Sequence, residues 1–319
     1  GQVKSFFGCE PLRVLLDGKE PILILKRKLP IINKCFFYVP RGPLLNFNER
    51  ENIRKFVFMA KEEAKKHSAL FLRMDPEIFE DSNKILIDLK TEGFVKSKKE
   101  IQPRTTFMLD ISKSLDEIMK GFESKFRYNI KLAEKKGVVI KQGTGEYLLN
   151  EFYDIYRETS SRQVFIIHPL IYYKKIRELM LEKGMGSIFI ANYGNQPIAG
   201  VIVFVFGERI WYMYGASSNK YRNLMPNNLI HWEIIKWAKE KGLKIYDLWG
   251  IPSNPSEKHP LWGVYRFKKG FNAKLVKFIG SYDLPFNKIL YNVFDRGIIC
   301  YQNLIRFIKK GSFSDSLAE

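Results

Sequence analysis

SIFIANYGNQPIAGVIVFVFGERIWYMYGASSNKYRNLMPNNLIHWEIIKWAKEKGLKIYDLW, residues 187–249, is the stretch that decides the fold. Three apolar runs follow one another, with Gly194-Asn195 and Gly207-Glu208 at the turns between them. A helical pattern comes next and stops at Gly242, before one more apolar run. The stretch therefore predicts three strands, a helix and a fourth strand, at Ser187–Asn192, Ile198–Phe206, Arg209–Ala216, Asn228–Lys241 and Lys244–Trp249.

The first half of the chain has a similar order of elements. It begins with strands at Ile22–Lys26 and Cys35–Val39, a helix at Phe47–His67 and a buried strand at Ala69–Met74. A short strand at Phe107–Leu109, a long basic helix at Ser114–Lys136 and a further strand at Val138–Lys141 follow. This order is the core of the acetyltransferase-type fold. We therefore predict an α+β protein with two acetyltransferase-like (GNAT-type) domains, whose mixed sheets are flanked by helices.

The expected domains follow from these two series. Residues 1–145 form the first domain together with residues 281–319, where the amphipathic segment Pro285–Lys310 predicts a C-terminal helix. Residues 146–280 form the second domain. A chain of 319 residues has ordinary length for two domains.

The charge of the chain narrows the class of partner. Its 53 Lys and Arg residues outnumber 34 Asp and Glu residues, which gives a formal net charge of +19. Such an excess favours nucleic acid, phosphorylated metabolites or an acidic membrane face. A lysine-rich genome is the alternative explanation. The three cysteines contain no CxxC pair and the four histidines have no metal-ligand spacing, so no metal site is expected. No apolar run reaches 18 residues and no signal peptide is visible, which predicts a cytoplasmic protein.

A loop before the predicted helix of the second domain is the first candidate site. The segment Tyr221–Asn228 contains no glycine, so coenzyme A binding by a glycine-rich loop is not expected. Arg222, Asn227 and Asn228 still place a cation and a helix N-terminus where a phosphate or carboxylate would fit. A surface arginine with an ordinary asparagine cap is the alternative.

Two further candidates follow downstream. Tyr246 and Asp247 lie at the end of a strand, where Asp247 accepts hydrogen bonds from either a ligand or loop amides. In the segment 261–271, Tyr265, Lys268 and Lys269 share one side of a predicted helix. A lysine there suits the negative charge on an attacked ester carbonyl or an RNA phosphate. A solvated basic face is the alternative.

The first half contributes a rigid loop and a basic helix. Arg41 lies in a rigid loop that contains two prolines and a glycine, and an arginine held in this way suits a phosphate. A simple strand-ending turn is the alternative. The helix within Ser114–Lys136 is strongly basic and suits an RNA backbone, or is a charged solvated face.

These segments, in this order, resemble the Fem family of peptidoglycan bridge-forming aminoacyltransferases. The matching stretches extend from about residue 12 to about residue 295 and read YVPRGP, RTTFMLDISKS, RYNIKLAEKKGV, ANYGNQPIAGVIV, YRNLMPNNLIHWEIIKWAKEKG, YDLWGIP and LWGVYRFKKGF. The resemblance implies two acetyltransferase-like domains. It also implies attack by a stem-peptide amine, of UDP-MurNAc-pentapeptide or of lipid II, on the ester of a charged tRNA.

The resemblance also implies roles for single residues. Lys268 would face the transfer site with Tyr265 beside it, Arg222 would lie near the substrate phosphates, and Asp110 would lie near the acceptor peptide. Asp247 would line the cleft together with Tyr265, and Lys269 is the alternative to Lys268. The other residues predicted to bind substrate are Asn227, Asn228, Tyr246, Arg41, Arg104 and Thr105. Trp249 precedes Gly250 where family members commonly have two glycines, so the shape of the cleft is expected to differ.

The resemblance further implies a compact, monomeric member. Only about ten residues separate the helices predicted at Tyr147–Thr159 and Pro169–Glu182, which leaves no room for the coiled-coil arm of many members. An ester is already activated, so no metal or organic cofactor is expected, and aminoacyl-tRNA is the co-substrate. Three alternatives remain at this stage: a non-catalytic RNA-binding protein, a coenzyme A-dependent N-acyltransferase, and a peripheral membrane protein held by its basic C-terminal segment.

Overall fold

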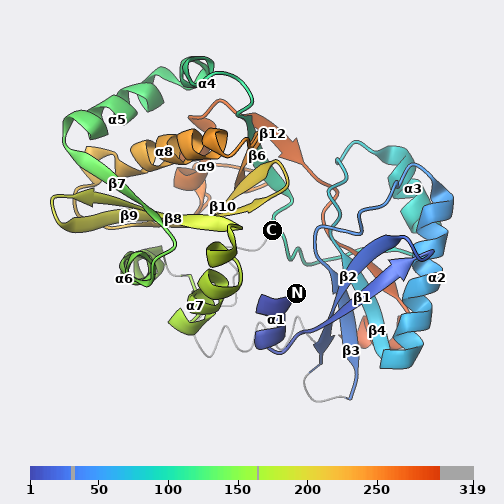
Figure 1. The fold of residues 1–319 in the computed structure, drawn as a ribbon. Helices are drawn as coiled ribbons and strands as arrows, with labels where there is room; N and C mark the ends of the chain where they lie inside the picture. Colours follow the sequence, from blue (N-terminus) through green and yellow to red (C-terminus); the bar gives the residue numbers. More distant parts are fainter. Residues whose placement is uncertain (30–32, 164, 295–319) are drawn as a thin grey trace.

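The computed structural model describes residues 1–29, 33–163 and 165–294, and it contains two mixed β-sheets (Figure 1). The smaller sheet has the order β1-β2-β3-β4-β13-β5. Its neighbouring strands are antiparallel except for β3 and β4, which run parallel because α2 crosses between them. The strands are β1 (Glu10–Leu16), β2 (Glu20–Lys28), β3 (Cys35–Val39), β4 (Ala69–Met74), β5 (Val95–Lys96) and β13 (Tyr282–Pro285).

The larger sheet has the order β12-β6-β11-β10-β9-β8-β7. Here β10 and β11 form the parallel pair, with α8 (Pro226–Glu240) as the crossover between them. All other neighbours are antiparallel. The strands are β6 (Thr105–Asp110), β7 (Val138–Gly143), β8 (Gly186–Tyr193), β9 (Gln196–Phe206), β10 (Arg209–Ser217), β11 (Ile245–Gly250) and β12 (Lys274–Lys277).

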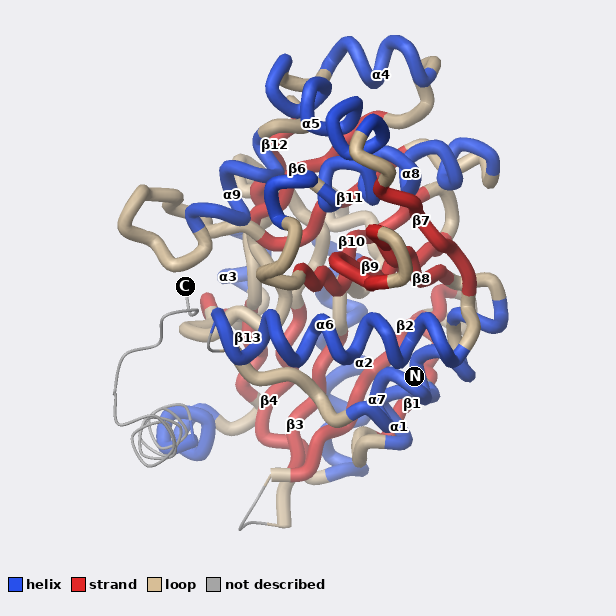
Figure 2. Tube along the Cα trace, turned by 90° about the vertical axis from the view of Figure 1, so that its left-hand side faces the viewer, coloured by secondary structure: helices blue, strands red, loops and turns tan. Residues whose placement is uncertain are grey.

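Helices cover both faces of the larger sheet. Figures 1 and 2 show β8 and β9 between α8 on one side and α6 on the other. Buried residues of α8 and α5 form one apolar cluster with the sheet, and those of α6 and α7 form another. In the smaller sheet, α2 and α3 cover one face. The helices are α1 (Gln2–Phe6), α2 (Arg50–His67), α3 (Asn83–Thr91), α4 (Leu115–Gly121), α5 (Ser124–Lys135), α6 (Glu146–Gln163), α7 (Leu170–Leu179) and α9 (Trp262–Lys269).

The predicted fold class is confirmed, but the sheets divide the chain elsewhere than at the expected boundary. Strands β6 and β7 pair within the larger sheet, so residues 105–143 belong with the second domain and not with the first. Many apolar side chains of this segment, such as Phe107, Ile118 and Phe126, are buried in the core of the larger sheet. The return of the chain to the first domain is as expected, because β13 lies between β4 and β5. The predicted C-terminal helix lies largely outside the described residues.

The long helix predicted at Ser114–Lys136 is two helices, α4 and α5. Ser114 and Glu117 form a capping box that starts α4. The backbone then becomes extended at Phe122, with φ −68° and ψ 156°, and turns that side chain into the core. There Phe122 packs edge-on against Phe126 of α5, with ring centroids 5.3 Å apart, and both rings are buried.

Candidate functional site

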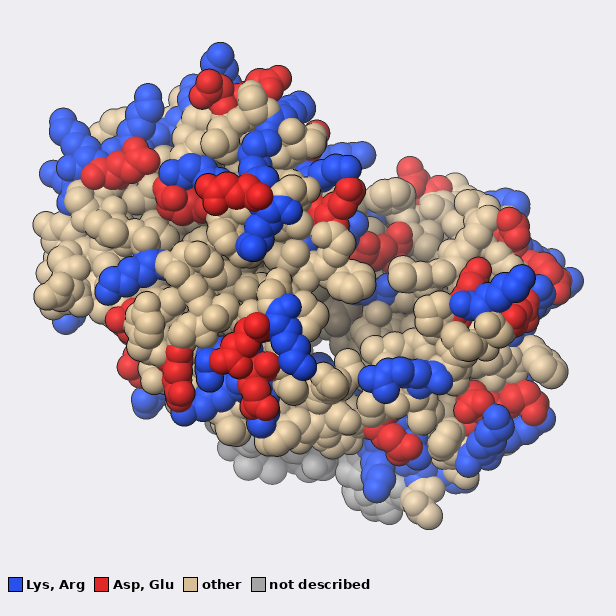
Figure 3. Space-filling view, in the orientation of Figure 1, with Lys and Arg blue, Asp and Glu red and all other residues tan. Residues whose placement is uncertain are grey.

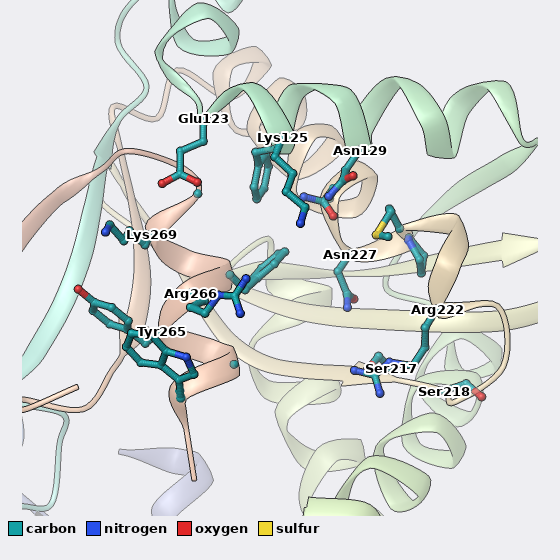
Figure 4. A pocket seen from close by; sticks show the side chains of 18 residues that line it. Glu123, Lys125, Asn129, Ser217, Ser218, Arg222, Asn227, Tyr265, Arg266 and Lys269 are labelled. Atoms are coloured by element: carbon teal, nitrogen blue, oxygen red, sulfur yellow. The ribbon is translucent and has the colours of Figure 1, made fainter. Parts of the chain in front are cut away.

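A cavity of about 670 Å³ opens beside the larger sheet. Figure 4 shows its walls: side chains of α5 point in from one side, those of α9 from a second, and the loop between β10 and α8 closes a third. These segments lie far apart in the sequence and meet at the carboxyl end of β10. Ligands of open α/β sheets commonly bind at such strand ends, so the cavity is the candidate site.

The loop between β10 and α8 leaves the start of the helix open. Tyr221 and Met225 both have positive φ, 57° and 54°, and they turn the chain before Pro226 begins α8. The first turn of α8 contains no acidic residue, and no side chain caps it. Its N–H groups and the positive end of the helix dipole therefore favour an anionic ligand.

The charges of the cavity wall point the same way. Lys125, Arg222, Arg266 and Lys269 line the cavity, against a single acid, Glu123. Among the residues that the structure describes, none of these four cations forms an ion pair. Four cations beside an open helix N-terminus make this a place for phosphate or carboxylate.

Neutral side chains add hydrogen-bonding groups and a flat apolar surface. Asn129 and Asn227, which are half-buried, and Asn228, which is buried, present amides to the cavity. The ring of Tyr265 is stacked on Trp262, with ring centroids 5.3 Å apart and planes at 20°. An aromatic pair of this kind offers a stacking surface for a nucleobase.

The structure brings together five of the residues predicted from the sequence. They line the cavity and are Arg222, Asn227, Asn228, Tyr265 and Lys269. The sequence had indicated Lys125 only as part of a basic helix. It gave no signal for the others, because their side chains reach the cavity only through packing of distant elements: Asn129, Ser217, Ser218 and Arg266.

Lys268, expected to face the transfer site, points away from this cavity into the protein. It is 5% exposed, and its Nζ donates hydrogen bonds to the backbone oxygens of Trp249 (3.2 Å) and Gly250 (2.8 Å). Burial lowers the pKa of Lys268 to about 7, against the opposing influence of Asp247. The prediction that Lys268 shares one side of the helix with Tyr265 and Lys269 is therefore wrong. On α9, Tyr265 and Lys269 face the cavity, whereas Lys268 faces the core.

The turn after β11 is held by buried polar groups. Trp249 has φ of 61°, a conformation in which a glycine would be unstrained. Asp247, 1% exposed, accepts hydrogen bonds from the Thr106 hydroxyl (2.6 Å) and from the N–H of Trp249 (2.8 Å). Burial raises the pKa of Asp247, which these two donors counter. Asp247 therefore holds the turn and does not line the cavity.

Tyr246 is fully buried and is part of the core. Its hydroxyl lies 2.6 Å from Nδ1 of His231. Burial lowers the pKa of His231 to about 3, so the imidazole is neutral at pH 7. The prediction that Tyr246 binds substrate is not met by this geometry.

Arg41, Arg104 and Thr105 lie where the two sheets meet. The Arg41 guanidinium donates to the Pro103 carbonyl (2.9 Å) and lies over the rings of Trp249 and Phe278, 5.2 and 5.1 Å from their centroids. Arg104 pairs with Glu80 and donates to the Phe278 carbonyl. The Thr105 hydroxyl lies 3.0 Å from that of Ser253. These three side chains join the domains and none lines the cavity.

Asp110 lies at the wrong end of the sheet for the predicted role. It pairs with Ile245 at the start of β11, whereas the turn at Trp249 is at the other end of that strand. Its exposed carboxylate accepts hydrogen bonds from the N–H and hydroxyl of Ser112, and these lower its pKa. Asp110 therefore stabilises the turn into α4.

No group of three or more His, Cys, Asp or Glu side chains that would suit a metal ion occurs within the described residues. No helix among them combines the length and the apolar character needed to cross a bilayer.

Comparison with known proteins identifies the family. The FemAB family matches residues 19–185 and 174–296. The chain belongs to the FemAB family. Relatives within it include lipid II:glycine glycyltransferases of Staphylococcus haemolyticus (strain JCSC1435) and Staphylococcus aureus (strain USA300). Each is 24% identical to this chain, over 86% of it and 82% of its own length.

Solved structures agree with the fold of this FemAB family member. The crystal structure of FemX superposes with a TM-score of 0.84 at 23% identity, over 92% of each chain. A tandem GNAT protein from the clavulanic acid biosynthesis pathway superposes with a TM-score of 0.52 at 10% identity, over 84% of this chain and 80% of its own. The alignment with the S. haemolyticus protein spans 345 residues, more than the 319 here, so that relative contains insertions. The compact form predicted from the sequence agrees with this.

Proposed function

We propose that this protein transfers an amino acid from an aminoacyl-tRNA to the stem-peptide amine of a peptidoglycan precursor, and that the acceptor is lipid II. The observation that carries the proposal is the cationic cavity at the open start of α8 in a member of the FemAB family. We further propose that the protein acts as a monomer in the cytoplasm, at the inner face of the membrane where a lipid-linked acceptor is found.

The class of enzyme follows from the family of the chain. The chain is an aminoacyltransferase, as its sequence predicted, because it belongs to a family whose relatives are named glycyltransferases. The names of those relatives support lipid II as the acceptor. The tRNA donor is supported by the net charge of +19 and by the four cations of the cavity.

The proposed reaction is aminolysis of an ester. The neutral amine of the acceptor attacks the ester carbonyl, a C–N bond forms, and the C–O bond to the terminal ribose breaks. The proton lost by the amine goes to the departing ribose oxygen. Because the ester is already activated, correct placement of the two reactants can contribute about 7–11 kcal/mol in favourable cases. The reaction as proposed needs no metal or organic cofactor.

The cavity suits the 3′ end of the donor. Arg222 and the first turn of α8 would bind its phosphate, and the Trp262–Tyr265 pair would stack on its terminal base. Lys268 would not contact the donor. Its hydrogen bonds to the carbonyls of Trp249 and Gly250 would instead maintain the conformation of the strand end. Lys268 is then a positioning residue.

The test is transfer with a panel of charged tRNAs and purified acceptors, read by mass spectrometry of the acceptor. We expect a mass increase of one amino acid on lipid II and a smaller yield on UDP-MurNAc-pentapeptide. Deacylated tRNA with free amino acid is the control and should give no product. If no charged tRNA modifies either acceptor, while the protein binds tRNA, the protein is an RNA-binding protein and the proposed function is wrong.

A further inference from the structure

The outward face of α5 has a pattern that the cavity does not explain. Lys125, Tyr128, Lys131 and Lys135, here called the α5 stripe, follow one another at helical spacings of three, three and four, and all four are exposed. The opposite face of α5 is fixed, because Phe126, Ile130 and Ala133 are buried in the core. Figure 3 shows Lys and Arg side chains gathered at the upper left of the molecule, where Figure 1 places α4 and α5.

The α5 stripe combines exposed lysines with an exposed aromatic ring. In the described parts of the chain, its three lysines form no ion pair. Arg127 on the same helix differs, because its guanidinium donates to the backbone oxygens of Lys120 and Phe122. Tyr128 is 64% exposed between these lysines. An exposed ring flanked by free cations is the arrangement that binds single-stranded nucleic acid, by stacking and by phosphate contacts.

The α5 stripe is continuous with the cavity. Lys125 belongs to both, and Asn129, one turn further, points into the cavity in Figure 4. A helix of 12 residues is about 18 Å long. That length spans roughly five phosphates at the spacing of one strand of a duplex. A strand that enters the cavity could therefore continue along the helix.

We propose that the α5 stripe binds the acceptor end of the donor RNA: its lysines contact phosphates and Tyr128 stacks on an unpaired base near the 3′ end. This inference rests on the proposed function, since it names the surface that holds the proposed donor. A lipid surface fits less well. Membrane-surface helices insert an apolar face into the bilayer, and the apolar face of α5 is buried in the core.

The experiment measures binding of uncharged tRNA by the full chain across a salt series. Lys131→Gln/Lys135→Gln should weaken binding and lower the slope of log K against log salt by about 1.4–1.8, the value for two lost phosphate contacts. Lys19→Gln/Lys61→Gln is the matched control, because it removes the same charge from exposed lysines of the first domain that form no ion pair with any described residue. It should change the slope little. Equal slopes for the two double variants would overturn the proposal.

Tyr128 separates stacking from charge. Tyr128→Ala should weaken tRNA binding about fivefold or more, whereas Tyr128→Phe should bind as the unchanged protein does. Loss of binding to phosphatidylglycerol vesicles, with tRNA binding intact in the lysine variants, would make the α5 stripe a membrane surface and contradict the proposal. If transfer from charged tRNA occurs but the slope is unchanged, only the α5 stripe fails. If the slope changes but no transfer occurs, only the proposed function fails.

Discussion

The two parallel crossovers of the molecule share an architecture but differ at the start of the helix. In the first domain β3, α2 and β4 form one crossover, and in the second β10, α8 and β11 form the other. The start of α2 carries its own acids, Glu49 and Glu51, and Glu49 accepts hydrogen bonds from neighbouring asparagine amides. The start of α8 carries no acid and faces four cations.

The strand ends of the two crossovers are alike in one respect. Each has a buried aspartate that accepts from a hydroxyl and from a backbone N–H: Asp75 from Tyr38 and Arg41, and Asp247 from Thr106 and Trp249. The buried aspartates therefore serve the fold in both domains. The difference in function lies at the helix starts. At α2 the positive end of the helix dipole lies beside acids of the protein itself, whereas at α8 it is available to an anionic ligand.

The largest effect is expected at Lys268, whose hydrogen bonds hold the end of β11 in the second crossover. Lys268→Ala should lower the free energy of unfolding by about 2–4 kcal/mol, because the Trp249 and Gly250 carbonyls each lose a hydrogen bond and a cavity is left in the core. Transfer should fall at least about tenfold through loss of the Trp249 turn. Chemical denaturation and a transfer assay measure the two effects. Full activity in a variant of normal stability would show that the turn does not need Lys268.

The pH dependence of stability isolates the charge of Lys268. Its folded pKa is about 7 and its ordinary value is 10.5, so between these values the unfolded chain holds a proton that the folded chain lacks. Stability should therefore rise with pH across this window, by up to about 1.4 kcal/mol per unit. Lys268→Met fills the same space without a charge and should show a flatter profile. Parallel profiles would contradict a buried, neutralised Lys268.

The next effect concerns the cavity itself. Arg222→Ala should lower kcat/KM about 10–100-fold, because it removes a charged contact to the anionic donor. Arg54→Ala, near the start of α2, is the matched control and should change kcat/KM less than about twofold, since Arg54 pairs with Glu92 on the surface. Equal losses in both variants would remove the distinction between the crossovers.

A smaller effect is expected from a substitution that makes the start of α8 resemble that of α2. Asn227→Asp should raise the free energy of unfolding by about 0.3–1 kcal/mol, because an acid in the first turn suits the helix dipole. Transfer should nevertheless fall several-fold, because the same charge repels an anionic donor. Glu49→Gln is the converse change at α2 and should cost a similar stability without any effect on transfer. An Asn227→Asp variant with unchanged KM for charged tRNA would argue against an anion site here.

The effect furthest from the transfer reaction is on stability alone, in the first domain. Burial raises the pKa of Asp75 to about 6 from its ordinary 3.8, despite the hydrogen bond from Tyr38. Between those values the folded chain holds the extra proton, so stability should fall as pH rises through this window. Asp75→Asn should remove most of this fall and leave transfer unchanged. Thermal melts at a series of pH values would measure it.

Much of the fold was predictable because its strands are short apolar runs between glycine turns. The strand Ala69–Met74 and the turn at Gly194 were predicted as the structure has them. The boundary at residue 145 was wrong because sequence order does not show which sheet a strand joins, and β6 pairs with strands more than a hundred residues away. The break at Phe122 was missed because helical periodicity continues through it.

The candidate site was predictable only where local sequence controls direction. Arg222, Asn227 and Asn228 follow from a loop that opens a helix. Lys268 and Lys269 are adjacent on a basic helix, and only packing decides that one enters the core and the other the cavity. Asp247 is buried although its residue type suits a ligand, since a strand-end carboxylate can equally hold a turn.

The position of β13 affects how the chain folds as it is made. β13 lies inside the first sheet, where Arg73 and Asp283 form a buried pair with both hydrogen bonds at 2.7 Å. The second domain, by contrast, is one continuous segment from β6 to β12. On the ribosome the N-terminal half therefore emerges first but lacks an inner strand until residue 285 has been added. We therefore expect the second domain to fold before the first, which reverses the usual order in which the N-terminal domain folds first.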